Sequence, residues 1–133
     1  MTVDIEIKNP KIMIKHFTDL KVWQEGHRLV LDLYRLTKKF PRDEQFGIVS
    51  QLRRAAVSVT SNIAEGYRRY FFKEKIRFYY MTRGSLSEIQ NLLIIVRDLQ
   101  YIDNKEFQDF YRHSEKVLAI INGLINKTPN FEN

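Results

Sequence analysis

Hydrophobic and small residues recur along this chain at alternating steps of three and four positions, in four separate segments. Alternating steps place the members of each set on one stripe of an α-helix, the side that packs against neighbouring helices. This pattern predicts an all-α bundle of four helices. The four sets are Val22, Gly26, Leu29, Leu33, Leu36 and Phe40; Val49, Leu52, Ala56, Val59, Ile63 and Gly66; Phe78, Thr82, Ser85, Ile89, Leu92, Val96 and Leu99; and Phe107, Phe110, Ser114, Val117, Ile121 and Leu124.

Short breaks separate the four segments. Pro41 ends the first, a stretch around residues 67–73 divides the second from the third, and Asp103 with Glu106 has capping-box spacing before the fourth. Short connections force consecutive helices to run antiparallel, up-down-up-down. We therefore expect a bundle domain over residues 17–127, preceded by an arm at 1–16 with strand-like alternation and followed by a tail at 128–133.

The composition favours a cytoplasmic globular domain. The chain has 133 residues, a net charge of +6 and no cysteine, which excludes disulfides and thiolate chemistry. Its longest apolar run, residues 92–96, is too short to cross a membrane, and its first residues are acidic where a secretory signal is basic.

Catalytic and cofactor motifs are missing from the sequence. No acidic residue has a histidine three positions later, and no glycine-rich phosphate loop or Gly-x-Ser-x-Gly turn occurs. The histidines are isolated, and the spacing of Asp109 and His113 suggests only a pair on a helix surface. The sequence thus predicts a protein that is not an enzyme and binds neither metal nor cofactor.

Positive charge concentrates between the second and third predicted helices. From Arg68 to Arg83 there are six basic residues and one acid, Glu74, with aromatic residues between them. Basic groups bind phosphates and aromatic faces stack on unpaired bases, a combination typical of RNA or single-stranded DNA binders. The alternative is that the aromatic residues anchor the core while the charges face water. The candidate binding residues are Arg53, Arg68, Arg69, Tyr70, Phe71, Lys73, Lys75, Arg77 and Arg83.

The second predicted helix carries a polar stripe beside its apolar one, and small side chains over the remaining arc. Such an arc allows another helix to approach closely, so contacts on more than one side are plausible. Partial shielding within the same bundle is the alternative. The stripe consists of Gln51, Arg54, Ser58, Asn62, Glu65 and Arg69.

The same helix carries a family resemblance. The segments 51–59 (QLRRAAVSV) and 61–66 (SNIAEG) closely resemble the signature of four-helix-bundle proteins encoded in intervening sequences of bacterial large-subunit ribosomal RNA genes. Residues 17–24, 40–47 and 84–88 give further matches in the right order, so the resemblance extends over residues 17–126. The arm at 1–16 and the unusually aromatic and basic segment at 67–72 depart from the family pattern.

The resemblance implies an antiparallel four-helix bundle that assembles into a ring, with a pentamer favoured. It also implies kinship with accessory variability proteins of diversity-generating retroelements, which act with a reverse transcriptase and nucleic acid. No enzymatic activity is established for the family. In this light the polar stripe becomes a hydrogen-bonded network between helices or subunits, in which Arg54 would pair with Glu65 or Glu88. Its members are Gln51, Arg54, Ser58, Asn62, Glu65, Gly66, Ser85 and Glu88.

These observations converge on a non-enzymatic homo-oligomer that binds RNA or single-stranded DNA through a basic surface, as an accessory factor to another protein. The alternative is a protein-interaction scaffold without a nucleic-acid role, whose positive charge serves solubility or an acidic protein partner. A more distant third is an enzyme with an unrecognised site.

Overall fold

A computed structural model describes residues 13–129 of the chain. Within that range there are only helices, which confirms the predicted all-α, four-helix class. None of these helices is long and apolar enough to cross a membrane. The strand-like arm before residue 13 lies outside the described residues. The elements are the 3-10 turn η2 (Phe17–Asp19), α1 (Lys21–Thr37), the 3-10 turn η3 (Arg42–Glu44), α2 (Ile48–Arg68), α3 (Phe72–Asp98) and α4 (Asn104–Lys127).

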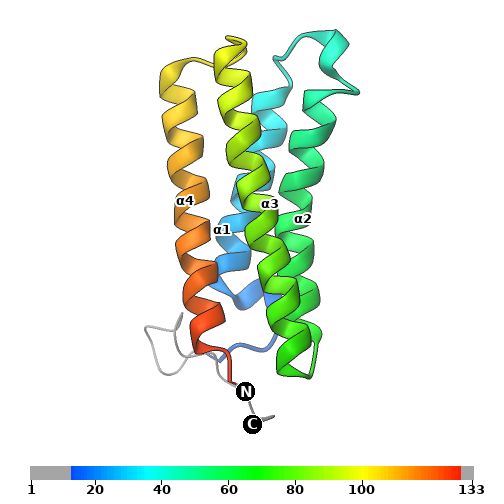
Figure 1. Ribbon diagram of the computed structural model, residues 1–133, viewed down its shortest axis with the longest axis vertical. Coiled ribbons are helices and arrows are strands. Elements are labelled where there is room, and N and C mark those ends of the chain that lie inside the picture. Colours follow the sequence, from blue (N-terminus) through cyan, green and yellow to red (C-terminus); the bar gives the residue numbers. More distant parts are fainter. Residues whose placement is uncertain (1–12, 130–133) are drawn as a thin grey trace.

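The four long helices lie side by side along the long axis of the molecule (Figure 1). The α1–α2 and α3–α4 links are at one end of the bundle, and the α2–α3 link is at the other. The α2–α3 link is the shortest, with three residues between Arg68 and Phe72. This turn therefore holds the ends of α2 and α3 close together.

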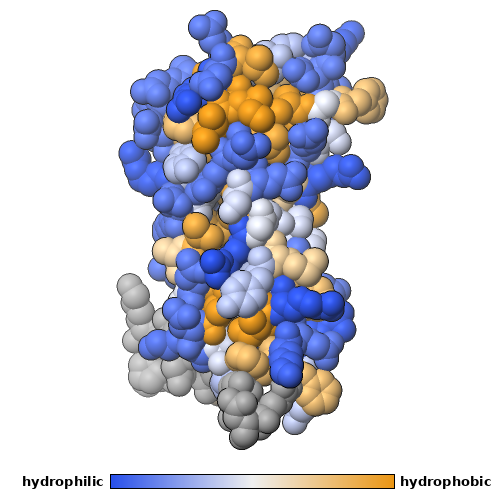
Figure 2. All heavy atoms as spheres, viewed as in Figure 1, coloured by the Kyte–Doolittle hydropathy of each residue, from blue (hydrophilic) through white to orange (hydrophobic). Residues whose placement is uncertain are grey.

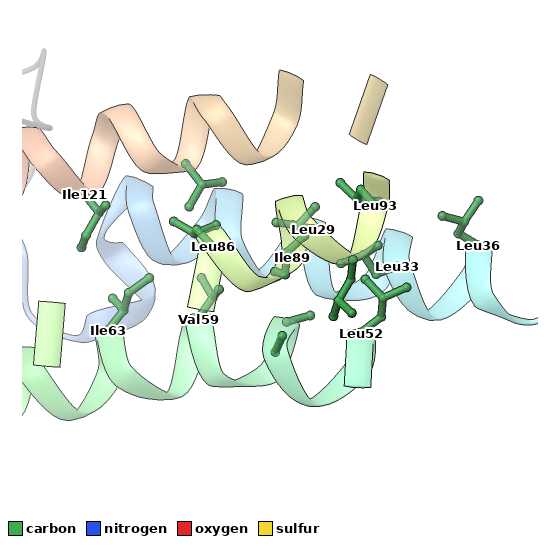
Figure 3. Close-up of a cluster of buried hydrophobic side chains, with 14 of the residues drawn as sticks. Leu29, Leu33, Leu36, Leu52, Val59, Ile63, Leu86, Ile89, Leu93 and Ile121 are labelled. Carbon is green, nitrogen blue, oxygen red and sulfur yellow. The ribbon is translucent and has the colours of Figure 1, made fainter. Parts of the chain in front are cut away.

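The core runs along the centre of the bundle and is built from branched aliphatic side chains of all four helices. Figure 3 shows Leu29 and Leu33 of α1, Leu52 and Val59 of α2 and other labelled residues turned toward one another. The four labelled side chains on α3 and α4 complete the cluster, and all four are fully buried. Burial of one such side chain stabilises the fold by about 1.5–3 kcal/mol. The α3 and α4 members are Leu86, Ile89, Leu93 and Ile121.

The buried stripe of α3 is displaced from the predicted one. Tyr79, Leu86 and Leu93 are buried where the spacing predicted Phe78, Ser85 and Leu99. Both sets share Thr82, Ile89, Leu92 and Val96, so periodicity alone does not separate two neighbouring rows of one helix. The packing of α2 decides between them, because the ring of Tyr79 fills the space at Gly66, where an added Cβ would come within 2.6 Å of Tyr79 Cε1.

The link between α3 and α4 has two specific end structures. Gln100 has a positive φ of 65°, and the amide of Tyr101 donates to the Val96 carbonyl at 2.9 Å, which ends α3 in a left-handed turn. Asp103 then caps α4: its side chain accepts from the Glu106 amide while Glu106 accepts from the Asp103 amide. This confirms the predicted capping box.

A buried carboxylate joins α1 to α4. Glu25 of α1, whose side chain is 8% exposed, contacts His113 Nε2 at 3.2 Å and Lys116 Nζ at 3.4 Å, both on α4, and Arg28 Nη1 at 3.0 Å. Burial alone would raise the pKa of Glu25, but the positive charges of Arg28, Lys116 and His113 together outweigh it and hold that pKa below its ordinary value. Asp109, which the spacing paired with His113, pairs with Lys105 instead.

The Glu25 cluster makes the stability of the bundle depend on pH. A carboxyl whose pKa is lower in the folded state stabilises the fold above its unfolded pKa, and this contribution disappears as the pH falls through the folded value. We expect Glu25→Gln to lower the free energy of unfolding by about 1–3 kcal/mol near pH 7. In urea titrations the difference from the wild type should shrink below about pH 4.5. The exposed Glu88→Gln is the control and should show no such difference; a deficit that persists at pH 2 would contradict the assignment.

The left-handed residue after α3 gives a second stability test. A non-glycine residue pays about 1 kcal/mol or more in this conformation, whereas glycine adopts it freely. Gln100→Gly should therefore raise the free energy of unfolding by up to about 1 kcal/mol, measured by thermal or urea denaturation. Gln108→Gly, at an exposed position inside α4, should lower it by a similar amount. Destabilisation by both substitutions would show that the positive φ of Gln100 is not a source of strain.

Candidate nucleic-acid interface

The basic and aromatic candidates lie at the α2–α3 turn and along the first half of α3. Arg69 and Phe71 flank the turn with extended backbones, and the amide of Lys75 donates to the Phe71 carbonyl at 3.0 Å as α3 begins. In Figure 2, strongly hydrophilic and hydrophobic side chains lie next to one another at this end of the molecule. The turn thus gathers most of the residues that the sequence grouped.

Four of the seven basic candidates are held by contacts within the chain. Arg69 pairs with Glu65 at 3.0 Å and with Glu74 at 3.5 Å. Lys75 Nζ donates to the carbonyl oxygens of Tyr67 at 2.7 Å and Gly66 at 3.3 Å, which places it over the C-terminus of α2. Burial lowers the pKa of the Lys75 ammonium. These two residues stabilise the turn.

Arg53 and Arg68 also serve packing. The Nε of Arg53 donates to Thr37 Oγ1 at 2.9 Å, and its guanidinium lies over the ring of Tyr34 at 4.5 Å, so it links α2 to the end of α1. Arg68 is exposed, but its guanidinium lies 3.1 Å from His16 Nε2 and over the ring of Phe17. Arg53 is thus directed toward the C-terminal end of α1, and Arg68 toward the segment that precedes α1.

The other three basic candidates are Lys73, Arg77 and Arg83. All three are exposed on α3, and none forms an ion pair with any residue from 13 to 129. The guanidinium of Arg83 lies 5.1 Å from the centre of the Tyr80 ring, and that of Arg77 lies 5.2 Å from the centre of the Phe78 ring. These contacts hold the two arginines along the helix without neutralising them.

Two aromatic side chains project from the turn itself. Tyr70 is 87% exposed and Phe71 is 54% exposed, and their rings meet edge to face with centroids 5.1 Å apart. Aromatic residues that anchored the core would be buried, so these two do not act as core anchors. They leave ring faces open to solvent beside unpaired cations.

The polar stripe of α2 divides into a bonded centre and exposed charged positions. Ser58 Oγ and Ser85 Oγ lie 2.8 Å apart across α2 and α3, and Asn62 Nδ2 donates to Ser58 Oγ at 3.0 Å. These three residues form the expected contact between helices. Gln51, Arg54 and Glu88 are exposed.

The expected pairing of Arg54 with Glu65 or Glu88 is wrong within one chain. Arg54 and Glu65 are eleven positions apart on α2, about 16 Å along its axis, and Glu65 instead pairs with Arg69 one turn away. Neither Arg54 nor Glu88 has an ion pair in the described part of the chain. Arg54 pairing with a neighbouring subunit remains a prediction.

Gly66 and Gly84, which lie in the family-like segments 61–66 and 84–88, play different roles. Gly66 is required by the fold, because a side chain there would collide with Tyr79. Gly84, in the middle of α3, has no atom of residues 13–129 within 4 Å of where its Cβ would be, apart from its own stretch of helix. A glycine inside a helix costs about 1 kcal/mol relative to alanine, so the packing of a single chain gives no reason for it.

The sequence interpretation missed one feature of this surface and one elsewhere in the bundle. Tyr80, which is 50% exposed, was counted among the aromatic residues but not among the candidate binding residues, although it lies beside the unpaired Arg77 and Arg83. The Glu25 cluster was also missed, since its partners are far apart in sequence. Helical spacing could have found Tyr80, which lies one turn after Arg77 and Ile76.

Comparison with known proteins places the chain in a family. The family model for "23S rRNA-intervening sequence protein" matches residues 18–123. A solved structure of a protein of unknown function from the S23 ribosomal protein family of Bacteroides thetaiotaomicron is similar, with a TM-score of 0.74 and 16% sequence identity, over 79% of this chain and 95% of that one. This structural likeness supports the fold, and no curated protein matches. The chain belongs to the 23S rRNA-intervening sequence protein family.

Proposed function

We propose that this chain is a non-enzymatic, homo-oligomeric bundle protein that binds RNA or single-stranded DNA and assists another protein that acts on nucleic acid. One observation carries the proposal. Lys73, Arg77 and Arg83 extend along α3 without a carboxylate partner among residues 13–129, beside the exposed rings of Tyr70 and Phe71. Unpaired cations attract phosphates and release their counterions, and open ring faces accept stacked bases.

Assembly is the second part of the proposal: antiparallel up-down-up-down bundles form a closed ring, with a pentamer favoured by the family resemblance. Two separate apolar patches support it. Ile94, Ile95 and Leu99 are 36–49% exposed at the C-terminal end of α3, where Figure 2 shows hydrophobic side chains gathered. The other patch comprises Leu31, Tyr34 and Val57 on α1 and α2. A ring of identical subunits joins two different patches of each chain.

A protein-interaction scaffold without a nucleic-acid role is the alternative, and the same apolar patches favour it, since they could contact a different protein. The two functions differ in what they require of α3. Nucleic-acid binding depends on the cations in its first half, whereas a scaffold depends on the apolar patch at its end.

The nucleic-acid function predicts a specific salt dependence. Binding of a fluorescent 20-nucleotide oligo(U) is measured by anisotropy between about 50 and 200 mM salt, where single-strand contacts contribute a slope of about −0.7 per neutralised phosphate. The triple variant Lys73→Gln, Arg77→Gln and Arg83→Gln should reduce the slope by about two. Arg69 and Lys75 stay unchanged because they support the turn.

The control removes three charges elsewhere: Lys38→Gln, Arg42→Gln and Lys127→Gln, all exposed positions. It should change the slope much less. Equal losses in the two triple variants would mean that overall charge, rather than α3, attracts the strand. Absence of wild-type binding at 50 mM salt would remove the nucleic-acid function and leave the scaffold.

The ring predicts a defined mass. Light scattering coupled to gel filtration should give about five times the 16.0 kDa mass of one chain. Ile95→Asp and Val57→Asp each place a charge in one of the two patches and should dissociate the ring, because an unpaired charge in an interface is strongly unfavourable. Phe46→Asp, at a side chain that is 95% exposed and outside both patches, should leave the mass unchanged. A wild-type monomer at micromolar concentration would contradict this assembly.

A further inference from the structure

A groove of about 500 Å³ lies on the outer side of the first half of α3. Its six lining residues recur as adjacent pairs spaced one helical turn apart, so they form a single stripe over the first turns of the helix. The stripe begins directly after the exposed Tyr70 and Phe71. The lining residues are Phe72, Lys73, Ile76, Arg77, Tyr80 and Met81.

The lining is apolar with a cationic edge. Phe72, Ile76, Tyr80 and Met81 supply two aromatic rings and two aliphatic chains, and none of the six residues is acidic. Tyr80 and Met81 are 50% and 48% exposed, so a large part of this apolar surface contacts water. An occupant that covers it gains from burial of both surfaces.

The edge of the groove is positively charged on both sides of Tyr80. Lys73 and Arg77 belong to the lining, and Arg83 lies over the Tyr80 ring at 5.1 Å. Beyond Tyr80, Gly84 lies one turn further along the same face, and it has open space where a side chain would be. Residues 13–129 therefore leave the groove open at that end.

We propose that this groove receives an unpaired nucleobase of a single-stranded nucleic acid, stacked on Tyr80, while the adjoining phosphates contact Lys73, Arg77 and Arg83. The inference rests on the proposed function and gives it a base-binding position. The occupant must combine a flat apolar group with closely spaced negative charges, and a single strand supplies both. Duplex nucleic acid keeps its bases paired and stacked inside, so it offers only the charges.

A second copy of this chain fits the groove less well. Two such grooves facing each other would oppose Lys73 and Arg77 of one subunit to the same residues of the other, and like charges in contact are unfavourable. The apolar patch at the other end of α3 consists of Ile94, Ile95 and Leu99, and the nearby Arg97 is paired with Asp98 at 2.9 Å.

The test compares two oligomers with the same number of phosphates. A fluorescent 12-nucleotide oligo(dT) and a 12-unit abasic strand are titrated with the wild-type protein at 50 mM salt, and binding is measured by anisotropy. Stacking of one base predicts about tenfold tighter binding of oligo(dT), because the abasic strand keeps only its phosphate contacts. A 12-base-pair duplex should show no such advantage per phosphate.

Tyr80→Ala should lower the preference for bases about tenfold and leave binding of the abasic strand unchanged. Phe46→Ala is the matched control, since Phe46 is an aromatic residue that is 95% exposed and precedes α2, at the other end of the bundle. It should keep the preference. Circular dichroism of both variants checks that the helices are intact.

The outcomes separate the groove from the proposed function. Equal binding of oligo(dT) and the abasic strand would overturn the base-binding groove and leave the basic surface standing. Binding of neither strand at 50 mM salt would overturn both. A preference for bases that is undiminished in Tyr80→Ala would also overturn the groove. A change of oligomeric mass in this variant would overturn it too, because it would identify the groove as a contact between subunits.

Discussion

The close contact between α2 and α3 fixes the rest of the molecule. Three residues connect the two helices, and Tyr79 packs into the space left by Gly66. Further along the pair, Thr82 Oγ1 donates to the Val59 carbonyl at 3.2 Å and Ser58 bonds Ser85. Together these contacts set the rotation of α3 about its axis. With Tyr79 and Thr82 turned inward, the row that contains Lys73, Arg77 and Tyr80 must face outward.

That rotation is the point at which sequence reasoning was incomplete. Four helices, their order and the capping box at Asp103 follow from spacing and local chemistry. The buried row of α3 does not follow from spacing. This 27-residue helix has a mixed pattern, in which two neighbouring stripes are about equally apolar. The choice depends on the absence of a side chain at position 66, a tertiary contact that periodicity does not contain.

The candidate surface was predictable as a segment but not residue by residue. A count of charged residues finds the excess of positive charge between Arg68 and Arg83. It does not show that Arg69 has two carboxylate partners or that Lys75 covers the end of α2, because these contacts form only when the turn closes. Tertiary structure thus separates cations that stabilise the turn from cations that are available to a ligand, and it leaves Lys73, Arg77 and Arg83 in the second group.

The length of α3 allows ligand binding and assembly to coexist on one helix. Met81, the last residue of the groove, and Ile94, the first residue of the apolar patch, are about 20 Å apart at 1.5 Å per residue. A subunit that covers the patch can therefore leave the groove open. If the chains close into a ring, each brings one groove to the assembly, and a strand long enough to reach two grooves binds the second at a high effective concentration. Weak attraction at one groove then suffices for retention of a long strand, and a short oligonucleotide measures the single groove alone.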